Sequence, residues 1–498
     1  MNNLVRTVVH KNNKIPEGIM SALSRMAQVS GVKNPIVALP DLHFKGSYHT
    51  PTGVVVLTKN TIVPKFVNPN CGMTFIVTPF FEKDFNNEKI DLIFSYLRKH
   101  ISVSAWSDPV ICVEDLKDIV KNGASWAISR QGLDKNDLNN FENKGSLFLD
   151  EEISSEEILS FIPDPCQKAG LRSMGVLGFG NHFIEMQKAE EILHNDIAEK
   201  FGIKKGQICF MMHGDSREFG RSIFDFYSKK AKKFFGLQQV YKKIHFSLLA
   251  SKYIPVWSKK ALRGINYHGN RLKSLLYWKF PFLNKIEAAE FSFILADSLE
   301  GRAYRISTYA ALNYAYANRT YMAGIIRDAL RNAFDRSDAQ IKILFDGSHD
   351  SLQQELVDGV KYWVHRNGAS RAYPPKSYPD HGIFSKTGQP VLLPSCLGNF
   401  SFLCAANIGC AQTYYSSSHG TGRLVDRGEA RYTFKDEDVL REVASSGMKV
   451  YDYGKGCVSE ESPRAFKNVN DVLEAIEENN IAASVVKLKP VAVLKGWI

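Results

Sequence analysis

Apolar residues in the first part of the chain fall into short runs that predict strands and helices. Within residues 36–82 the runs PIVALP, TGVVVLT and MTFIVTPF are separated by polar turns, which is typical of buried strands. Residues 87–99 and 114–121 place apolar side chains three or four positions apart, which predicts two helices. Strands and helices are therefore both expected before residue 122.

The middle of the chain is predicted to be mainly helical. A polar, acidic stretch at 134–157 is expected to form a mobile connection or a helical hairpin, and strand-like runs return at 173–186 and 207–213. A helix-rich block follows over residues 220–336. Within it, residues 308–330 predict a long helix that is too apolar on several faces to lie on the surface.

Strand-like runs dominate again beyond residue 341. IKILFD, YWVHR, PVLLP and FSFLCA precede a predicted helix, VNDVLEAIEENN, and a final strand, VVKLKPVAVLKG. Strand-rich ends around a helical middle predict an α+β fold with a β-rich core. We expect one large domain over residues 1–498, interrupted by a helical, basic insertion at 225–300.

Composition excludes several classes of protein. Among 498 residues, 44% hydrophobic and 23% charged residues are near globular averages, which excludes collagen-like, coiled-coil and wholly disordered chains. The first residues lack an apolar segment of signal-peptide length, and the uncharged stretch 387–422 is interrupted by proline, glycine and asparagine. We therefore expect a cytoplasmic protein without a membrane partner. Its eight cysteines form no CxxC pair and are expected to be reduced.

Positive charge is concentrated in one segment. Residues 229–285 contain fourteen Lys and Arg and no Asp or Glu, which exceeds the net charge of +11 for the whole chain. Aromatic residues such as Trp257 and Tyr267 are interleaved with these cations. Cations with aromatic side chains suit a phosphate backbone with unstacked bases, but a solvated helical face or an anionic membrane surface would have the same composition.

Histidines and one cysteine recur beside glycines in short turns that follow apolar runs. A lone histidine of this kind is usually structural, but five such segments together favour a site. Cysteine and imidazole ligands select ions such as Mn, Fe, Co or Zn, and the wide spacing favours a catalytic site over a zinc finger. The residues are Cys71, His182, His213, His349 and His419, with Asp41 and His43 in a sixth segment, PDLHFKGS.

The segment SSSHGTGR around His419 has the composition of a phosphate-binding loop. Hydroxyl groups, glycine amides and Arg423 surround one histidine there. An imidazole nitrogen can attack phosphorus and form a phosphoramidate. A Ser/Gly surface turn would have the same composition.

Taken together, these motifs resemble the RtcB family of RNA ligases. The resemblance covers residues 35–496 and rests on PDLHFKGS, NCGM, GFGNHFIE, MMHGDSREFG, YAYANR, RNGASRAYPP, SSSHGTGR and the ending AVLKG in this order. It implies a GTP- and Mn²⁺-dependent ligase that joins an RNA 3′-phosphate or 2′,3′-cyclic phosphate to a 5′-hydroxyl through a histidine–GMP intermediate, in tRNA splicing or RNA repair. It also implies RNA as substrate and an archease protein as a possible activator.

The resemblance also assigns roles to individual residues. His419 matches the histidine that accepts GMP, and Asp41 matches the carboxylate that holds its ring. Arg217 and Arg423 are candidates for holding RNA phosphates. The implied ligands of two manganese ions are Cys71, His182, His213 and His349, with Asn68 at the position of a further ligand. The implied nucleotide contacts are Asn181, Glu185, Cys396, Gly420, Phe466 and Lys495.

Four positions depart from the family pattern. Asn68 replaces a metal-binding aspartate, and Cys396 replaces a serine that contacts the nucleotide. Asp215 appears within HGDSR and Asp350 follows His349. Either new carboxylate would restore the lost charge, or the second metal site is weaker.

Two alternatives remain open at the level of sequence. The chain could be a divergent paralogue that repairs RNA or caps 3′-phosphate ends with GMP, or a catalytically impaired RNA-binding protein on the ligase scaffold. The retained soft-metal ligands favour an enzyme, because a protein that only binds RNA has no need of them.

Overall fold

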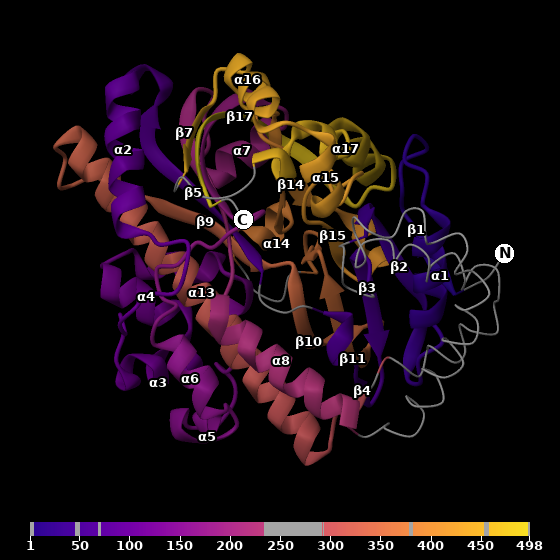
Figure 1. Ribbon diagram of the computed structural model, residues 1–498. Coiled ribbons are helices and arrows are strands. Elements are labelled where there is room, and N and C mark those ends of the chain that lie inside the picture. The colour runs from indigo at the N-terminus through magenta and orange to yellow at the C-terminus, as the bar shows by residue number, and fades with distance from the viewer. Residues whose placement is uncertain are drawn as a thin grey trace.

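The computed structural model describes residues 4–44, 50–67, 71–233, 291, 293–377, 382–452 and 458–496 (Figure 1). Asn68 and most of the basic segment, residues 234–290, lie outside the described residues. The insertion predicted at 225–300 is therefore described only at its two ends.

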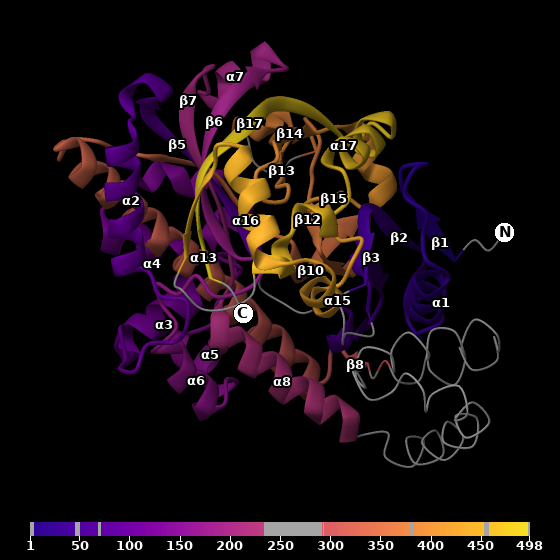
Figure 2. The ribbon, with the colours of Figure 1, turned by 45° about the horizontal axis from the view of Figure 1, so that its top comes forward.

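Within the described residues, the larger sheet has eight strands and forms the centre of the molecule. Its order is β13-β14-β17-β6-β7-β5-β9, and its pairs are antiparallel except for β16, which runs parallel to β17. Figure 2 shows β17 as a long, curved strand, and its neighbours in the sheet order are β14 and β6. The strands are β5 (Gly72–Phe81), β6 (Phe183–Ile192), β7 (Gln207–Gly214), β9 (Lys342–Ser348), β13 (Pro390–Leu393), β14 (Ser401–Ala406), β16 (Lys449–Asp452) and β17 (Ala482–Lys495).

A second sheet has the order β1-β2-β3-β11-β10. The two sheets are connected at His349, because β9 ends at Ser348 and β10 begins at Asp350. The strands of the second sheet are β1 (Val5–Thr7), β2 (Val32–His43), β3 (Thr52–Thr58), β10 (Asp350–Val357) and β11 (Val360–Asn367). Two short pairs are β4 (Thr61–Ile62) with β8 (Ile294–Leu295), and β12 (Ala369–Arg371) with β15 (Ser416–Ser418).

The long helix α13 (Leu299–Phe334) confirms the buried helix predicted at 308–330. Ser298 caps its first turn by accepting a hydrogen bond from the Gly301 amide, and residues on every face of its central turns are buried. Figure 1 shows several shorter helices gathered around it. They are α2 (Asn87–His100), α3 (Val113–Asn122), α4 (Ala124–Gln131), α5 (Ser155–Ser160), α6 (Asp164–Gly170) and α8 (Arg217–Lys233).

Further helices and 3₁₀ turns complete the described structure. The α-helices are α1 (Glu17–Met26), α7 (Asn195–Phe201), α14 (Phe384–Thr387), α15 (Arg427–Thr433), α16 (Asp436–Ser445) and α17 (Val469–Glu478). The 3₁₀ turns are η1 (Pro64–Phe66), η2 (Glu82–Asp84), η3 (Lys135–Asn140), η4 (Glu142–Gly145), η6 (Ile408–Thr413), η7 (Val458–Glu461) and η8 (Pro463–Ala465). Two sheets combined with a helical layer confirm the predicted α+β class.

A buried ion pair fixes α13 against the large sheet. Arg319 donates two hydrogen bonds to Asp346 of β9, with Nε to Oδ2 at 2.9 Å and Nη2 to Oδ1 at 2.5 Å. Its Nη1 donates to the Gly214 carbonyl at the end of β7, at 3.2 Å. Both charged side chains are fully buried. Removing one partner of such a pair typically costs about 3–5 kcal/mol, so this contact holds the ends of β7 and β9 in place.

The stretch 134–157 is neither a mobile connection nor a helical hairpin, and that prediction is wrong. It forms η3, η4 and the beginning of α5. Two of its acidic side chains are buried, because they accept hydrogen bonds from the large sheet: Asp137 from the Ile343 amide at 2.8 Å and Glu142 from the Ser348 amide at 2.7 Å. Burial raises the pKa of Asp137 to about 6, against the opposing effect of that amide.

The strand predicted over 173–186 also begins later than expected. Residues before β6, which starts at Phe183, form turns in which Gly175, Gly178 and Gly180 have positive φ angles. Such backbone is easily adopted only by glycine and cannot continue a strand. The other strands and helices predicted between residues 36 and 122 and beyond 341 are confirmed. Among the residues described, no helix is long and apolar enough to cross a membrane.

Candidate active site

Neighbouring strands of the large sheet bring the predicted metal ligands to one end of that sheet. Cys71 precedes β5, His182 precedes β6, His213 lies near the end of β7, and His349 follows β9. The register pairs His213 with both Met73 and Phe183, and pairs Gly72 with Ser348. A Cβ at Gly72 would lie 2.6 Å from Arg319 and from the Gly347 carbonyl, so glycine lets the start of β5 pack closely against β9 and the Arg319 side chain. Residues far apart in the sequence therefore meet because their strands are paired.

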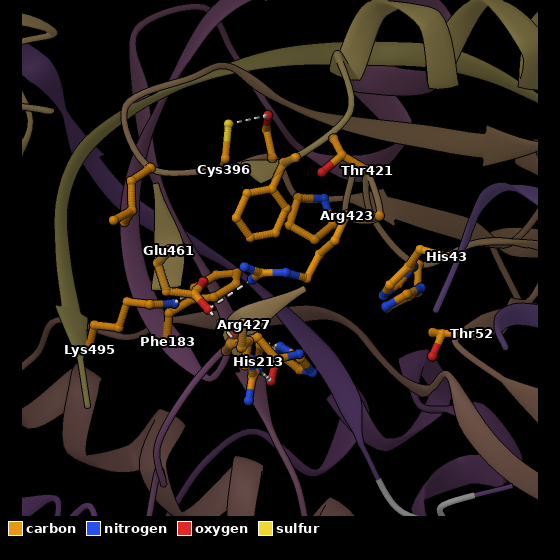
Figure 3. A pocket seen from close by; sticks show the side chains of 18 of the residues that line it. His43, Thr52, Phe183, His213, Cys396, Thr421, Arg423, Arg427, Glu461 and Lys495 are labelled. Atoms are coloured by element: carbon orange, nitrogen blue, oxygen red, sulfur yellow. Dashed lines mark hydrogen bonds and ion pairs between the residues drawn. The ribbon is translucent and has the colours of Figure 1, made fainter. Parts of the chain in front are cut away.

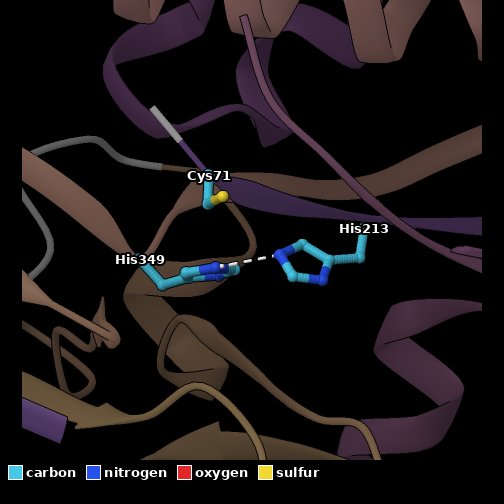
Figure 4. Close-up of side chains that lie close together, drawn as sticks. All are labelled: Cys71, His213 and His349. Atoms are coloured by element: carbon cyan, nitrogen blue, oxygen red, sulfur yellow. Dashed lines mark hydrogen bonds between the residues drawn. The ribbon is translucent and has the colours of Figure 1, made fainter. Parts of the chain in front are cut away.

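Cys71, His213 and His349 form a first group of donor atoms suited to one metal ion (Figure 4). Their ligand atoms lie within 4.8 Å of one another, and the Nε2 atoms of the two histidines are 3.1 Å apart. The Nδ1 of His213 lies 2.9 Å from the Asn181 carbonyl, so this nitrogen carries the proton and Nε2 presents a lone pair. Burial and the neighbouring His182 hold the pKa of His213 well below its ordinary value, which favours the neutral, ligating form.

Cys71, His182 and Asp215 form a second group, which shares the thiol of Cys71 with the first. Asp215 belongs to the turn between β7 and α8. The other introduced carboxylate, Asp350, lies in neither group; its Oδ1 accepts a hydrogen bond from the Gly368 amide at 2.6 Å. Of the two acidic replacements, the fold therefore brings Asp215 to the predicted ligands.

His419 is held by Asp41, as the resemblance implies. The Nδ1 of His419 lies 2.5 Å from Oδ2 of the fully buried Asp41, and the His419 amide donates to the same oxygen at 3.2 Å. Burial acts to raise the pKa of Asp41, but the hydrogen bond from His419 and nearby positive charge, including that of Lys467, bring that pKa below its ordinary value. With the Nδ1 proton directed to Asp41, Nε2 is the ring nitrogen of His419 that carries the lone pair.

The His419 ring lies beside the metal-ligand groups. Its centroid is 4.6 Å from that of His349, which is 4.8 Å from His213, which in turn is 4.7 Å from His182. The loop that carries His419 approaches β2 closely, because Gly422 has a φ of +72° and a Cβ there would collide with the Asp41 carbonyl. The nucleophile candidate and the ligand candidates thus form one continuous row of imidazoles.

His419 lines a cavity of about 300 Å³. Figure 3 shows side chains of this cavity, with Glu461 between Lys495 and the arginines. The lining of this cavity includes every residue to which the resemblance assigns a nucleotide contact: Asn181, Glu185, Cys396, Gly420, Phe466 and Lys495. Cys396 accepts a hydrogen bond from the Asn399 side chain at 2.9 Å, and burial raises the pKa of its thiol. We call this cavity, with its lining, the pocket.

Several charged groups in the pocket are paired with one another, and Glu461, Lys495 and Glu185 among them are buried. Glu461 lies 3.1 Å from Lys495, 3.4 Å from Arg423 and 4.0 Å from Arg427. Burial lowers the pKa of Lys495, although Glu461 opposes this effect. Burial raises the pKa of Glu185 to about 7, partly offset by a 2.6 Å hydrogen bond from Gln187 and by the charge of Lys495.

The two arginines expected to hold RNA phosphates differ in position. Arg423 lies inside the pocket, where its guanidinium stands 4.5 Å from the centre of the Phe466 ring and its Nε donates to the Val425 carbonyl at 3.0 Å. Arg217 lies by the second ligand group, with Nη1 3.2 Å from Asp215. A role in binding RNA stays a prediction for both.

Some pocket residues were given no specific role from the sequence. Glu461 and Arg427 were given no role, and their only signal is the charge of the segments next to RAFKNVND and SSSHGTGR. His43 was noted only as part of PDLHFKGS. Its Nδ1 lies 2.8 Å from the Asp41 carbonyl, and burial lowers its pKa to about 3, so a neutral imidazole lines the pocket.

Comparison with known proteins identifies the family of the chain. The family model described as tRNA-splicing ligase RtcB matches residues 22–496. A tRNA-splicing ligase RtcB of Methanococcus maripaludis is 26% identical over 97% of this chain and 92% of the relative, and one of Thermococcus kodakarensis is 28% identical over 95% and 90%. One of Pyrococcus furiosus is 29% identical over 89% of this chain, which spans only 41% of that relative's length. The family match over nearly all of the chain shows that it belongs to the RtcB family.

Proposed function

We propose that this protein is an RNA ligase that joins an RNA 3′-phosphate or 2′,3′-cyclic phosphate end to a 5′-hydroxyl end, with GTP as cosubstrate and Mn²⁺ as cofactor. The observation that carries the proposal is the position of His419. Asp41 holds its Nδ1 at 2.5 Å, and its ring lies beside the ligand His349 and lines the pocket. Family membership and the names of the relatives support ligation as the reaction.

The donor atoms fit a divalent ion of the manganese type. Cys71, His182, His213 and His349 would hold it, and buried, neutral imidazoles beside one thiol suit such ions. When bound, the ions would draw negative charge from the triphosphate and from the reacting phosphates.

His419 would perform the first chemical step. Its Nε2 attacks the α-phosphorus of GTP, an N–P bond forms, and the P–O bond to pyrophosphate breaks. Asp41 accepts the Nδ1–H hydrogen bond and stabilises the positive charge that develops on the ring. The pocket would receive the guanine, since the ionised Glu185 can accept from N1–H and the amine while Lys495 donates to O6.

Two further transfers would complete the reaction. An oxygen of the RNA 3′-phosphate attacks the phosphorus on His419, so the N–P bond breaks and the 3′ end carries GMP. The 5′-hydroxyl then attacks the 3′-phosphate, loses its proton and releases GMP as the phosphodiester forms. A cyclic phosphate is first opened by water. Action in the cytoplasm, in tRNA splicing or RNA repair, and dependence on an archease activator belong to this proposal and rest on the resemblance.

Covalent labelling tests the proposal. Incubation with GTP labelled at the α-phosphorus and with Mn²⁺ should transfer the label to the wild-type protein, and addition of RNA with a 3′-phosphate should remove it. His419→Asn keeps a polar side chain of similar size and should abolish labelling without loss of the fold. Labelling that persists in His419→Asn would assign the nucleophile to another residue, and wild-type protein that never becomes labelled would exclude the mechanism.

A further inference from the structure

We propose that Asp215 supplies the carboxylate ligand of a second divalent ion, with Cys71 and His182 as the other donors. The inference rests on the proposed function in one respect, because it takes Cys71 to be a metal ligand. It goes further in assigning the second site to Asp215, one of the positions that depart from the family pattern.

The distances between the three donor atoms fit coordination of one ion. Oδ2 of Asp215 lies 3.9 Å from Sγ of Cys71 and 3.8 Å from Nε2 of His182, and the sulfur and that nitrogen are 3.4 Å apart. Bonds of about 2.0–2.3 Å from one ion place neighbouring ligands roughly 3–4 Å apart. All three separations lie in that range, so an ion could bind with little movement of the side chains.

The orientation of the carboxylate also favours coordination. Oδ1 of Asp215 accepts from the Arg217 amide at 2.7 Å and from its Nη1 at 3.2 Å. These contacts turn Oδ2 toward the thiol and the imidazole. The Asp215 side chain is 22% exposed, so an ion and a coordinating water could reach it from solvent.

His182 presents the correct nitrogen. Its Nδ1 lies 2.9 Å from the Leu177 carbonyl, which places the proton there and leaves the Nε2 lone pair directed at Cys71 and Asp215. In this tautomer the nearby Arg217 Nη1, at 3.1 Å from Nδ1, is a close neighbour rather than a donor to the ring. A backbone acceptor behind a ligating imidazole is the usual arrangement at metal sites.

Charge gives an independent reason. Cys71 belongs to both groups, so the single negative charge of its thiolate would be shared between two ions. A second site made only of Cys71 and the neutral imidazole of His182 would therefore have little negative charge. Asn68 stands where the family has an aspartate and can offer only a neutral oxygen. Asp215, in the turn after β7, supplies one carboxylate next to Cys71 and His182. The competing explanation is that Asp215 serves only as the counter-ion of Arg217.

Metal counting separates these explanations without using GTP or RNA. Equilibrium dialysis against Mn²⁺ should give two ions per chain for the wild type and one for Asp215→Asn, with the affinity of the second site lowered roughly 10- to 100-fold or more. Arg217→Gln removes the positive charge that pairs with Asp215, and this variant should still bind two Mn²⁺ ions. Asp350→Asn is the matched control, because it neutralises a buried carboxylate next to His349 that lies in neither donor group.

Three results would overturn the inference: two ions retained by Asp215→Asn, a single ion in the wild type, or equal loss in Asp350→Asn. Thermal unfolding of each variant shows whether the fold is intact, and because Asn has nearly the size of Asp we expect it to be. A wild type that binds two Mn²⁺ ions but is never labelled by GTP would contradict the proposed ligase mechanism and leave the assignment of Asp215 standing.

Discussion

The ligand cluster and the pocket lie side by side but are built in different ways. The ligand cluster consists of Cys71, His182, His213, His349 and Asp215, most of them at the ends of paired strands of the large sheet. Much of the pocket lining comes from the loops after β13 and β15, the start of α15, the 3₁₀ turn η7 and the residue after η8. Strand register fixes the first set of side chains, whereas loops and short turns position the second.

The two regions also differ in how their polar groups are satisfied. In the ligand cluster, backbone carbonyls hold the outer nitrogens of His182 and His213, and the inner nitrogens converge on Cys71 or on one another. In the pocket, Glu461 is shared among three cationic side chains. The ligand cluster is therefore preorganised for an ion, whereas in the proposed function the pocket would exchange some of its internal ion pairs for contacts to a nucleotide.

Removing the shared thiol should have the largest effect, because it affects both donor groups at once. Cys71→Ser replaces a soft sulfur with a hydroxyl that stays protonated at neutral pH. We expect loss of both Mn²⁺ ions in equilibrium dialysis, with the affinity of each lowered by at least about 100-fold, and no detectable RNA joining. Wild-type metal content in Cys71→Ser would contradict the assignment of this cluster.

Asp41→Asn should damage chemistry while leaving metal binding unchanged, and this would separate the nucleophile from the ligand cluster. The amide cannot balance a charged imidazole and can orient the ring with the wrong nitrogen protonated. We expect the single-turnover rate of GMP transfer to His419 to fall roughly 10²- to 10⁴-fold, as for other His–Asp pairs. Mn²⁺ dialysis on the same variant is the control, and a lower ion count would show that Asp41 acts through the metal ligands instead.

The same contrast explains how much of the site could be predicted from the sequence. Histidines and a cysteine at strand ends are visible as apolar runs that finish in glycine-flanked turns, and paired strands bring such ends together. Cys71, His182, His213 and His349 could therefore be placed in one site. Asp215 and Asp350 could not be distinguished, because which side chain reaches the thiol depends on the direction of the turn after β7.

Pairings across the pocket could not be predicted. Glu461 and Lys495 belong to segments with no shared periodicity, and their contact depends on how η7 lies against the end of β17. The error at 134–157 has a related cause. In the sequence, Asp137 and Glu142 look like solvated charges. In the structure, each is buried and accepts a hydrogen bond from a backbone amide of the large sheet. Sequence patterns describe the exposure that a residue type prefers, and tertiary hydrogen bonds can override it.

Titration of Glu185 should produce the smallest effect, and it tests the pocket alone. Burial raises its pKa from 4.5 to about 7, so near neutral pH a large part of this carboxyl is protonated in the nucleotide-free protein. Guanine N1–H and the exocyclic amine require an ionised acceptor. GTP affinity should therefore rise as pH increases from about 6 to 8, by at most about tenfold per pH unit below the pKa, and level off above it.

Ionisation of Glu185 should strengthen GTP binding as pH rises but should lower the free energy of unfolding. Because the folded protein holds the Glu185 proton at a higher pH than the unfolded chain does, this group reduces the free energy of unfolding as pH rises from 4.5 toward 7.

Glu185→Gln has no carboxyl proton to lose in this pH range, so its nucleotide affinity should be weaker and nearly independent of pH. Isothermal titration of wild type and Glu185→Gln with GTP at several pH values, without RNA, checks this. Parallel pH profiles for the two proteins would show that another group, such as Lys495, controls binding. A flat wild-type profile would mean that the pocket keeps Glu185 ionised throughout.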